Sequence, residues 1–347
     1  MSEVKKTTHV SSIDALRGIA ALAVCLFHFS GGFLAKDNIV TIANQYGYLG
    51  VDAFYVISGF VIPLSFSVKN YQITQFWSYF KKRFVRIEPA YWVSMVLIIF
   101  KEMTGIFIQD YRYFQFPNYS FAGIGGHFLH INDFFNLPWL QAVYWTLAID
   151  WQFFLLIGVL FFWVNRSEWW ARYPLYVAFI GVKWWFDPLA TKPWLFYFLP
   201  LFVPGMVLFH YKRGYMNLLS FISIFIPSVK KETLQRLEFS LIMGGVLYAI
   251  FYKMWWNHLI AAALSVLIIE FFTHDFKFMT YMGKISYSMY LTHIFSGWWV
   301  TSVLVHVLQD EISRTVAVFI GVVVSIAFAK LFYDYVEKPT QEWARKV

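Results

Sequence analysis

The sequence is poor in charged residues. Only 14% of its 347 residues are Asp, Glu, Lys or Arg, whereas 59% are hydrophobic. A soluble globular chain carries about 25% charged residues, so this chain has little polar surface to present to water. Its single cysteine, Cys25, excludes an intramolecular disulfide framework. No tandem repeat, low-complexity tract or linker divides the sequence, and we expect residues 1–347 to form one domain without a separate soluble domain.

What the chain has instead is a series of apolar runs near 20 residues long. This is the length that an α-helix needs to cross ~30 Å of hydrocarbon. Tryptophan is abundant near the ends of the runs, as interfacial belts require. We therefore predict an all-α polytopic integral membrane protein with about ten transmembrane helices around a polar central cavity. The predicted spans are 13–34, 47–66, 90–108, 140–164, 173–187, 194–211, 238–252, 258–273, 281–305 and 315–335.

The net charge of +8 has a membrane explanation. A basic chain can also bind nucleic acid, but here most Lys and Arg residues fall in alternate loops, as the positive-inside rule demands. The asymmetry predicts two cytoplasmic termini and no nucleic-acid partner. The first apolar run is too long for a signal peptide and carries two ionisable residues, so we interpret it as a retained helix. Segment 215–229 is apolar too, and we interpret it as interfacial or re-entrant.

Ionisable residues inside the spans are the strongest functional signal. A charge at bilayer depth costs several kcal/mol by insertion scales, so such residues usually face the bundle interior. Arg17 and His28 are eleven residues apart, which places both on one helix face about 16 Å apart along the axis. Arg17 could instead snorkel to the interface and His28 could be a core histidine. In a membrane helix we favour a functional pair.

A cationic patch precedes the third predicted span in FKKRFVRIEPAYW (Phe80–Trp92). Arg83 and Arg86 have i,i+3 spacing, so their guanidinium groups can converge on one anion. An ordinary positive-inside anchor explains the neighbouring lysines. For the two arginines, spacing alone leaves an anchor and a phosphate site equally open.

Other polar residues in the spans suggest a polar cavity through the bundle. Each could instead be a helix-packing hydrogen bond, and this alternative is strongest for Ser286 and Ser288. It is weakest for Asp150. The remaining candidates for a site are Asp52, Ser58, Tyr290 and His293, of which the last two share a helix face. We expect Cys25, which has apolar neighbours, to be inert packing rather than an acyl carrier.

Six segments in order resemble the acyltransferase 3 family. They are IDALRGIAALAVCLFHFS (Ile13–Ser30), GVDAFYVISGF (Gly50–Phe60), RFVRIEPAYW (Arg83–Trp92), YWTLAIDWQFF (Tyr144–Phe154), ISYSMYLTH (Ile285–His293) and VEKP (Val336–Pro339). The resemblance implies a ten-helix domain in the bacterial inner membrane. It also implies transfer of an acyl group, commonly acetyl, from cytoplasmic acyl-CoA to a sugar hydroxyl of a surface glycan or lipid-linked sugar. Asp150 stands where the family usually has Glu.

The chemistry of acyl transfer assigns roles to these residues. A hydroxyl acceptor needs a base, and His28 suits that task because an unperturbed histidine has a pKa near 6.5. Asp150 could orient His28 or stabilise its protonated form. Arg83, Arg86 and Arg17 would hold the phosphates of acetyl-CoA. The predicted outer loop, about 109–139, carries His127, His130 and Asp133, which could help to bind a sugar. They are too weak a signal for a metal, and we predict none.

Two other functions remain open at this point. Buried His, Asp and Arg residues also build proton relays, so a proton-coupled small-molecule transporter is the main alternative. The sequence shows no inverted repeat to support it. A non-catalytic membrane scaffold would leave the buried charges without a purpose.

Overall fold

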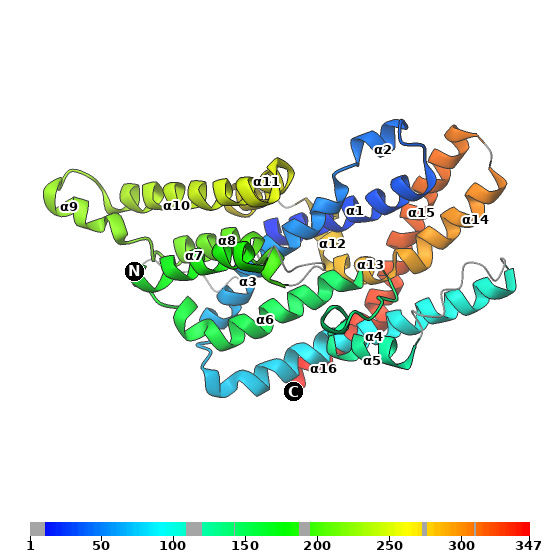
Figure 1. Cartoon of the computed structure of the whole chain (residues 1–347), viewed down its shortest axis with the longest axis horizontal. Coiled ribbons are helices and arrows are strands. Elements are labelled where there is room, and N and C mark those ends of the chain that lie inside the picture. Colours follow the sequence, from blue (N-terminus) through cyan, green and yellow to red (C-terminus); the bar gives the residue numbers. More distant parts are fainter. Residues whose placement is uncertain (1–10, 109–119, 142, 187–194, 273–275, 309) are drawn as a thin grey trace. The chain divides into compact units, whose positions relative to one another are not determined.

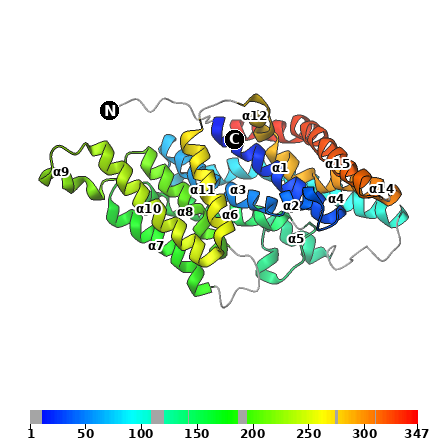
Figure 2. The same ribbon diagram turned by 90° about the horizontal axis from the view of Figure 1, so that it is seen from above.

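A computed structural model describes residues 11–108, 120–141, 143–186, 195–272, 276–308 and 310–347. The described residues form helices and connecting turns and contain no β-strand, as the hydrophobic runs predicted. The chain divides into two compact units (Figures 1 and 2). Unit 1 comprises Met1–Leu16, Val51–Phe76 and Ile149–Thr280, and unit 2 comprises Arg17–Gly50, Trp77–Ala148 and Tyr281–Val347. Each unit is described by itself.

The protein is a multi-pass membrane protein. Within the described residues, six helical stretches are long and apolar enough to cross a bilayer: Ser11–Phe33, Ile39–Val68, Tyr144–Val164, Leu195–Lys212, Lys231–Met254 and Glu311–Lys346. Two shorter apolar helices are Trp256–Phe271 and Ile294–Val307. The ten spans and the central cavity stay predictions.

Unit 1 is built around a group of long helices that run side by side (Figures 1 and 2). Helix α8 packs on α7, α10 and α11, and α10 joins α11 as a helical hairpin. The helices of this unit are α3 (Gly50–Val68), η2 (Ile73–Gln75), α6 (Tyr144–Val164), α7 (Trp169–Phe186), α8 (Leu195–Lys212), η6 (Leu218–Phe221), α9 (Ile222–Phe225), α10 (Lys231–Met254), α11 (Trp256–Phe271) and the first residues of α12 (Lys277–Lys284).

Two backbones meet in unit 1 where α3 crosses α8. A Cβ atom added to Gly59 would lie 2.1 Å from the carbonyl oxygen of Phe202, and one added to Gly205 would lie 2.1 Å from that of Val56. Only glycine permits so close an approach. The crossing therefore fixes the part of α3 that carries Ser58, one of the predicted site residues.

Segment 215–229 contains only η6 and α9, each four residues long. Neither reaches the length of about 20 residues that a helical span needs. Several apolar side chains of the segment are exposed, with Ile224 and Phe225 at 76% and 78%, whereas Met216 is buried. The structure thus agrees with the interpretation that this segment does not cross the membrane.

Unit 2 contains most of the first helix and the last helices of the chain. Helices α13 and α14 pack on α15 (Figure 1). Its helices are α1 (Ser11–Phe33), α2 (Ile39–Ala43), η1 (Gly47–Leu49), α4 (Phe76–Ile108), α5 (Phe121–Leu129), η5 (Asn132–Phe135), α13 (Ser286–Thr292), η7 (Ile294–Trp298), α14 (Trp299–Val307), α15 (Glu311–Phe332), η8 (Tyr333–Glu337) and α16 (Lys338–Lys346). Helix α1 starts, and α6 ends, in unit 1.

Two π-helical turns interrupt the long helices of unit 2. Turn η7 begins directly after His293, and its wider spacing is visible in the bond from the Trp298 amide to the His293 carbonyl, 3.0 Å, five residues back. Turn η8 ends on Glu337. The sequence predicted one continuous helix over 281–305, but side-chain periodicity cannot reveal a single extra residue in a turn. Such turns are frequent at functional sites.

The cationic patch lies in the same helix as residues 90–108, the predicted third span. Helix α4 is continuous from Phe76 to Ile108 and includes Pro89. After α4, the described part of the predicted outer loop folds back as α5 and η5 against the middle of α4. The hydroxyl of Tyr91 contacts His127 in α5 at 2.7 Å. Tyr91 lies about 25 Å along the axis from the end of α4 at Ile108.

Candidate active site

Two histidines meet in unit 2. His28 on α1 and His293 at the end of α13 have ring centroids 5.5 Å apart. Nδ1 of His293 lies 3.0 Å from the carbonyl oxygens of Met289 and Tyr290. Because carbonyl oxygens only accept hydrogen bonds, Nδ1 carries the hydrogen and Nε2 keeps a free lone pair. Nε2 is buried and has no hydrogen-bond partner among the described residues, so His293 presents a basic nitrogen inside the unit.

The histidine pair combines one accessible and one buried ring. His28 is half-buried, whereas His293 is fully buried. Both Arg17 and His28 lie on the single helix α1, as predicted, so the spacing of about 16 Å between them holds. Cys25 on the same helix is buried.

Tyr290 anchors the helix that carries His293. Its hydroxyl donates to the carbonyl oxygen of Val143 at 2.6 Å and contacts the hydroxyl of Thr146. The rings of Tyr290 and His293 are 6.3 Å apart. The predicted shared face of these two residues is confirmed, and the tyrosine positions the buried histidine.

Three arginines gather in unit 2 with one carboxylate. Arg86 interacts electrostatically with the positive charges of Arg17 and Arg83 and with the negative charge of Glu337. Arg17 also interacts electrostatically with Glu337. Among the described residues, no carboxylate lies within ion-pair distance of Arg17 or Arg86. Arg17 and Arg83 both lie near enough to Arg86 to act on its charge, and the convergence of Arg83 and Arg86 on one anion stays a prediction.

Glu337 is held by its own neighbours. Ser288 binds one carboxylate oxygen through its hydroxyl, 2.5 Å, and its backbone amide, 3.2 Å, and Gln341 binds the other at 2.8 Å. Ser288 therefore makes a helix-packing hydrogen bond, which is the alternative that the sequence favoured for this residue. The carboxylate places one negative charge beside the three arginines, whose planar forks suit a phosphate.

Asp150, Ser58 and Asp52 belong to unit 1. The Ser58 hydroxyl donates to Oδ1 of Asp150 at 2.5 Å. Asp52 is buried and pairs with Nδ1 of His258 on α11 at 2.6 Å. Sequence reasoning missed His258, which lies 206 residues after Asp52 along the chain. The role of Asp150 toward His28 stays a prediction.

The α5–η5 element adds a buried acid–base pair to unit 2. Nε2 of His130 lies 2.9 Å from Oε1 of Glu88, and both side chains are buried. The other oxygen of Glu88, Oε2, has no hydrogen-bond partner among the described residues. His130 caps α5 in the left-handed conformation with φ 54°, a position that usually takes glycine. Sequence reasoning missed Glu88, although a carboxylate inside an apolar helix was a usable signal.

His127 is buried, and both of its ring nitrogens have partners. Its Nε2 accepts a hydrogen bond from the Leu140 amide at 3.1 Å, so Nδ1 carries the hydrogen and donates to Tyr91. Burial, assisted by the charge of His130, lowers the pKa of His127 to about 3. Asp133 accepts from Trp139 at 2.9 Å. Within the described residues no group of three or more His, Cys, Asp or Glu could hold a metal ion.

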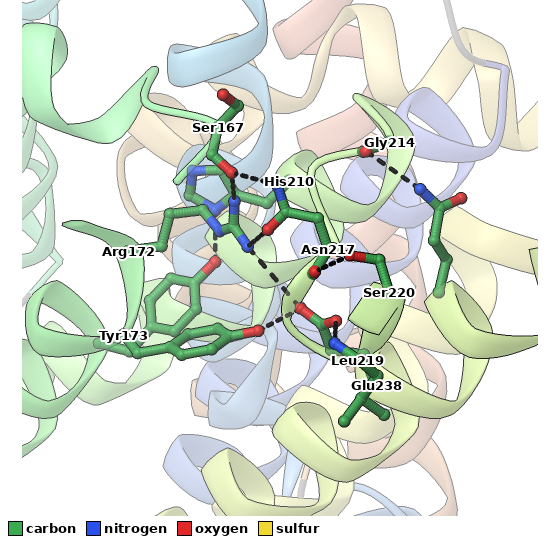
Figure 3. A network of polar contacts seen from close by, with 11 residues as sticks. Ser167, Arg172, Tyr173, His210, Gly214, Asn217, Leu219, Ser220 and Glu238 are labelled. Atoms are coloured by element: carbon green, nitrogen blue, oxygen red, sulfur yellow. Dashed lines mark hydrogen bonds and ion pairs between the residues drawn. The ribbon is translucent and has the colours of Figure 1, made fainter. Parts of the chain in front are cut away.

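Unit 1 has a polar network of a different kind (Figure 3). Arg172 and Glu238 are fully or almost fully buried, with Nη2 and Oε1 3.7 Å apart. Arg172 also donates to the Ser167 carbonyl and to Asn217, and Tyr173 donates to Glu238. Arg172 lies in the first turn of α7.

Comparison with known sequences identifies the family of the chain. Residues 10–334 match a family of transferases described as the acyltransferase domain. The chain belongs to this acyltransferase family. It is 25% identical to the peptidoglycan O-acetyltransferase OatA of Listeria monocytogenes serovar 1/2a, over 98% of this chain and 58% of the relative.

Relatives in Staphylococcus aureus match a shorter stretch. The O-acetyltransferase OatA of strain NCTC 8325 / PS 47 is 29% identical over 43% of this chain and 24% of the relative. A putative O-acetyltransferase of strain COL is 27% identical over 46% and 26%. The chain thus spans 58% or less of the length of these relatives. No solved structure matches the chain.

Proposed function

We propose that the protein transfers an acetyl group from cytoplasmic acetyl-CoA to a hydroxyl of an extracytoplasmic sugar, in a surface glycan or a lipid-linked precursor. The acceptor hydroxyl oxygen attacks the thioester carbonyl, and His28 takes the hydroxyl proton. Coenzyme A leaves as a thiolate and recovers that proton as a thiol. The printed names of the relatives, all O-acetyltransferases, support the choice of acetyl and of an oxygen acceptor.

The observation that carries this proposal is the content of unit 2. A histidine pair with an open nitrogen and a cluster of three arginines lie in one compact unit. The arginines supply forks for the phosphates of coenzyme A. Helix α1 joins the two sites through Arg17 and His28, about 16 Å apart, and the pantetheine arm would bridge that distance.

The same proposal includes a location. In the bacterial inner membrane, cytoplasmic termini would put the arginine cluster on the side where acyl-CoA is found. Charge asymmetry between the predicted loops supports this orientation. A reporter enzyme that is active only in the cytoplasm should work when fused at Val347, and a periplasmic signal there would contradict the topology.

The test is a comparison of His28→Gln with Arg86→Lys in purified protein. A positioned general base contributes about 10²–10⁴-fold to rate, so His28→Gln should lose transfer by that factor and still bind acetyl-CoA. Arg86→Lys keeps the charge but loses the fork, so its binding of acetyl-CoA should weaken. The acceptor is surface polymer of the host stripped of esters by mild alkali, and ester-bound acetate is measured.

His306→Gln serves as the matched control, because His306 is an exposed histidine of the same unit. It should transfer normally. A near wild-type rate for His28→Gln would remove His28 as the base and leave Nε2 of His293 as the next candidate. A wild-type protein that neither transfers nor hydrolyses acetyl-CoA would favour the proton-coupled transporter.

A further inference from the structure

The non-spanning segment between α8 and α10 has an exposed apolar face that the proposed reaction does not use. Phe221, Ile224, Phe225 and Ile226 are exposed by 51%, 76%, 78% and 49%. They lie on η6 and α9 and at the residue after α9, and both helices are too short to cross a bilayer. An apolar face of this kind on a short helical element is typical of a segment that lies in the membrane interface.

Cationic side chains border this face on both sides. Lys212 and Arg213 precede it and Lys230 and Lys231 follow it, and all four are exposed. Lys212 is paired with Glu270 at 2.7 Å. Within the described residues no ion pair engages Arg213, Lys230 or Lys231. These three cations flank an apolar wedge, which is the charge pattern that complements an anionic lipid surface.

The buried network of unit 1 holds the segment in place. The Leu219 amide donates to Oε2 of Glu238 at 2.9 Å, and Asn217 donates to the Ser167 carbonyl at 2.9 Å (Figure 3). Arg172 binds both Asn217 and Glu238. The start of the segment is therefore tied to α7 and α10 by bonds to buried groups. Its exposed apolar tip is presented from a fixed base, which is what insertion into a lipid surface requires.

We propose that residues 218–226 insert into the headgroup region of the lipid leaflet, and that Lys230, Lys231 and Arg213 bind the phosphates of anionic lipids there. The occupant of the apolar face is thus a lipid surface rather than a protein. This inference does not depend on the acetyl-transfer proposal, because it concerns residues of unit 1 that take no part in that reaction.

The test uses a fluorescent label at the tip of the segment. Cys25 is the chain's single cysteine and is buried, so a Cys25→Ala/Phe225→Cys protein carries one reactive thiol. The protein is labelled with an environment-sensitive dye and placed in nanodiscs of phosphatidylcholine, with or without 30% phosphatidylglycerol. Lipids with a spin label on the acyl chain should quench the dye strongly. A label at Thr233, exposed on the first turn of α10, is the matched control and should be quenched little.

The charge arm separates lipid recognition from simple insertion. A lysine near an anionic surface contributes about a fivefold preference for it. Quenching at position 225 should increase with phosphatidylglycerol, and Lys230→Gln/Lys231→Gln should remove that increase. A water-exposed label at position 225 in both lipid mixtures would overturn the proposal and leave the face to a protein partner. Equal quenching in both mixtures, unaffected by the lysine substitutions, would overturn the anionic-lipid assignment.

Discussion

Both units group charged side chains, but they treat them differently. In unit 1, Arg172 meets a carboxylate, an amide and a carbonyl, and each oxygen of Glu238 accepts a hydrogen bond. In unit 2, Arg17 and Arg83 are only partly buried and Arg86 is exposed, and Nε2 of His293 has no hydrogen-bond partner among the described residues. A buried ion pair held by further hydrogen bonds braces a fold, whereas cationic groups that stay accessible can bind a ligand. The difference separates a braced part of the molecule from the part in which we propose that the reaction takes place.

The largest expected effect is the loss of stability when the buried ion pair of unit 1 is broken. Glu238→Gln leaves the guanidinium of Arg172 buried without its counter-charge, which should cost about 3–5 kcal/mol of folding free energy. The measurement is thermal unfolding in detergent. Glu232→Gln, an exposed position on the same helix, should change little. A Glu238→Gln protein of normal stability that has lost transfer would erase the distinction between the two units.

A smaller effect is expected at the close helix crossings. Gly59→Ala in unit 1 and Gly297→Ala in unit 2 place a Cβ atom 2.1 Å and 2.0 Å from a carbonyl oxygen. Overpacking of this kind costs about 1–3 kcal/mol. Because Gly297 lies four residues after His293, its substitution should also reduce transfer per folded molecule, whereas Gly59→Ala should not.

Gly244→Ala is the control for both substitutions, since open space surrounds that position, and alanine there should be neutral or stabilising. Unfolding temperature and transfer per folded molecule are measured for all three proteins. Equal losses of specific transfer at Gly59 and Gly297 would show that the reactive geometry is not confined to unit 2.

The smallest effect concerns pH. Since the pKa of His127 is lowered to about 3, the unfolded chain binds a proton below pH 6.5 that the folded chain does not. Stability should therefore be full above pH 6.5 and fall as the pH drops toward 3. At pH 5 the loss is about 2 kcal/mol. Unfolding temperatures of wild type and His127→Gln between pH 7 and 5 test this, and the variant should show a shallower dependence. Parallel curves would contradict the assignment.

The sequence was most informative where local spacing decides geometry. The helical membrane architecture follows from apolar runs, and the meeting of Arg83 with Arg86 follows from i,i+3 spacing on α4. Arg17 and His28 share α1 for the same reason. Regular periodicity predicts these features because each depends on residues within a few turns of one another.

Pairings between distant segments could not be predicted. Glu88 with His130, and Asp52 with His258, are separated by 42 and 206 residues. Such pairs depend on how helices pack, and the sequence alone does not specify that. The same limit applies to the burial of Arg172, which depends on contacts with residues distant in the sequence.

The π-turn after His293 also fixes an angle. A turn with one additional residue behaves as a single insertion in an α-helix, and it rotates everything that follows by about 100° relative to what precedes it. The side chains of residues 286–293 can therefore face one set of neighbours while those of residues 299–307 face another, although both belong to one continuous run of the chain. The first part of that run can point His293 inward while the remainder packs Thr301 toward α15. The one additional residue of the π-turn lets the two parts of the run contact different neighbours.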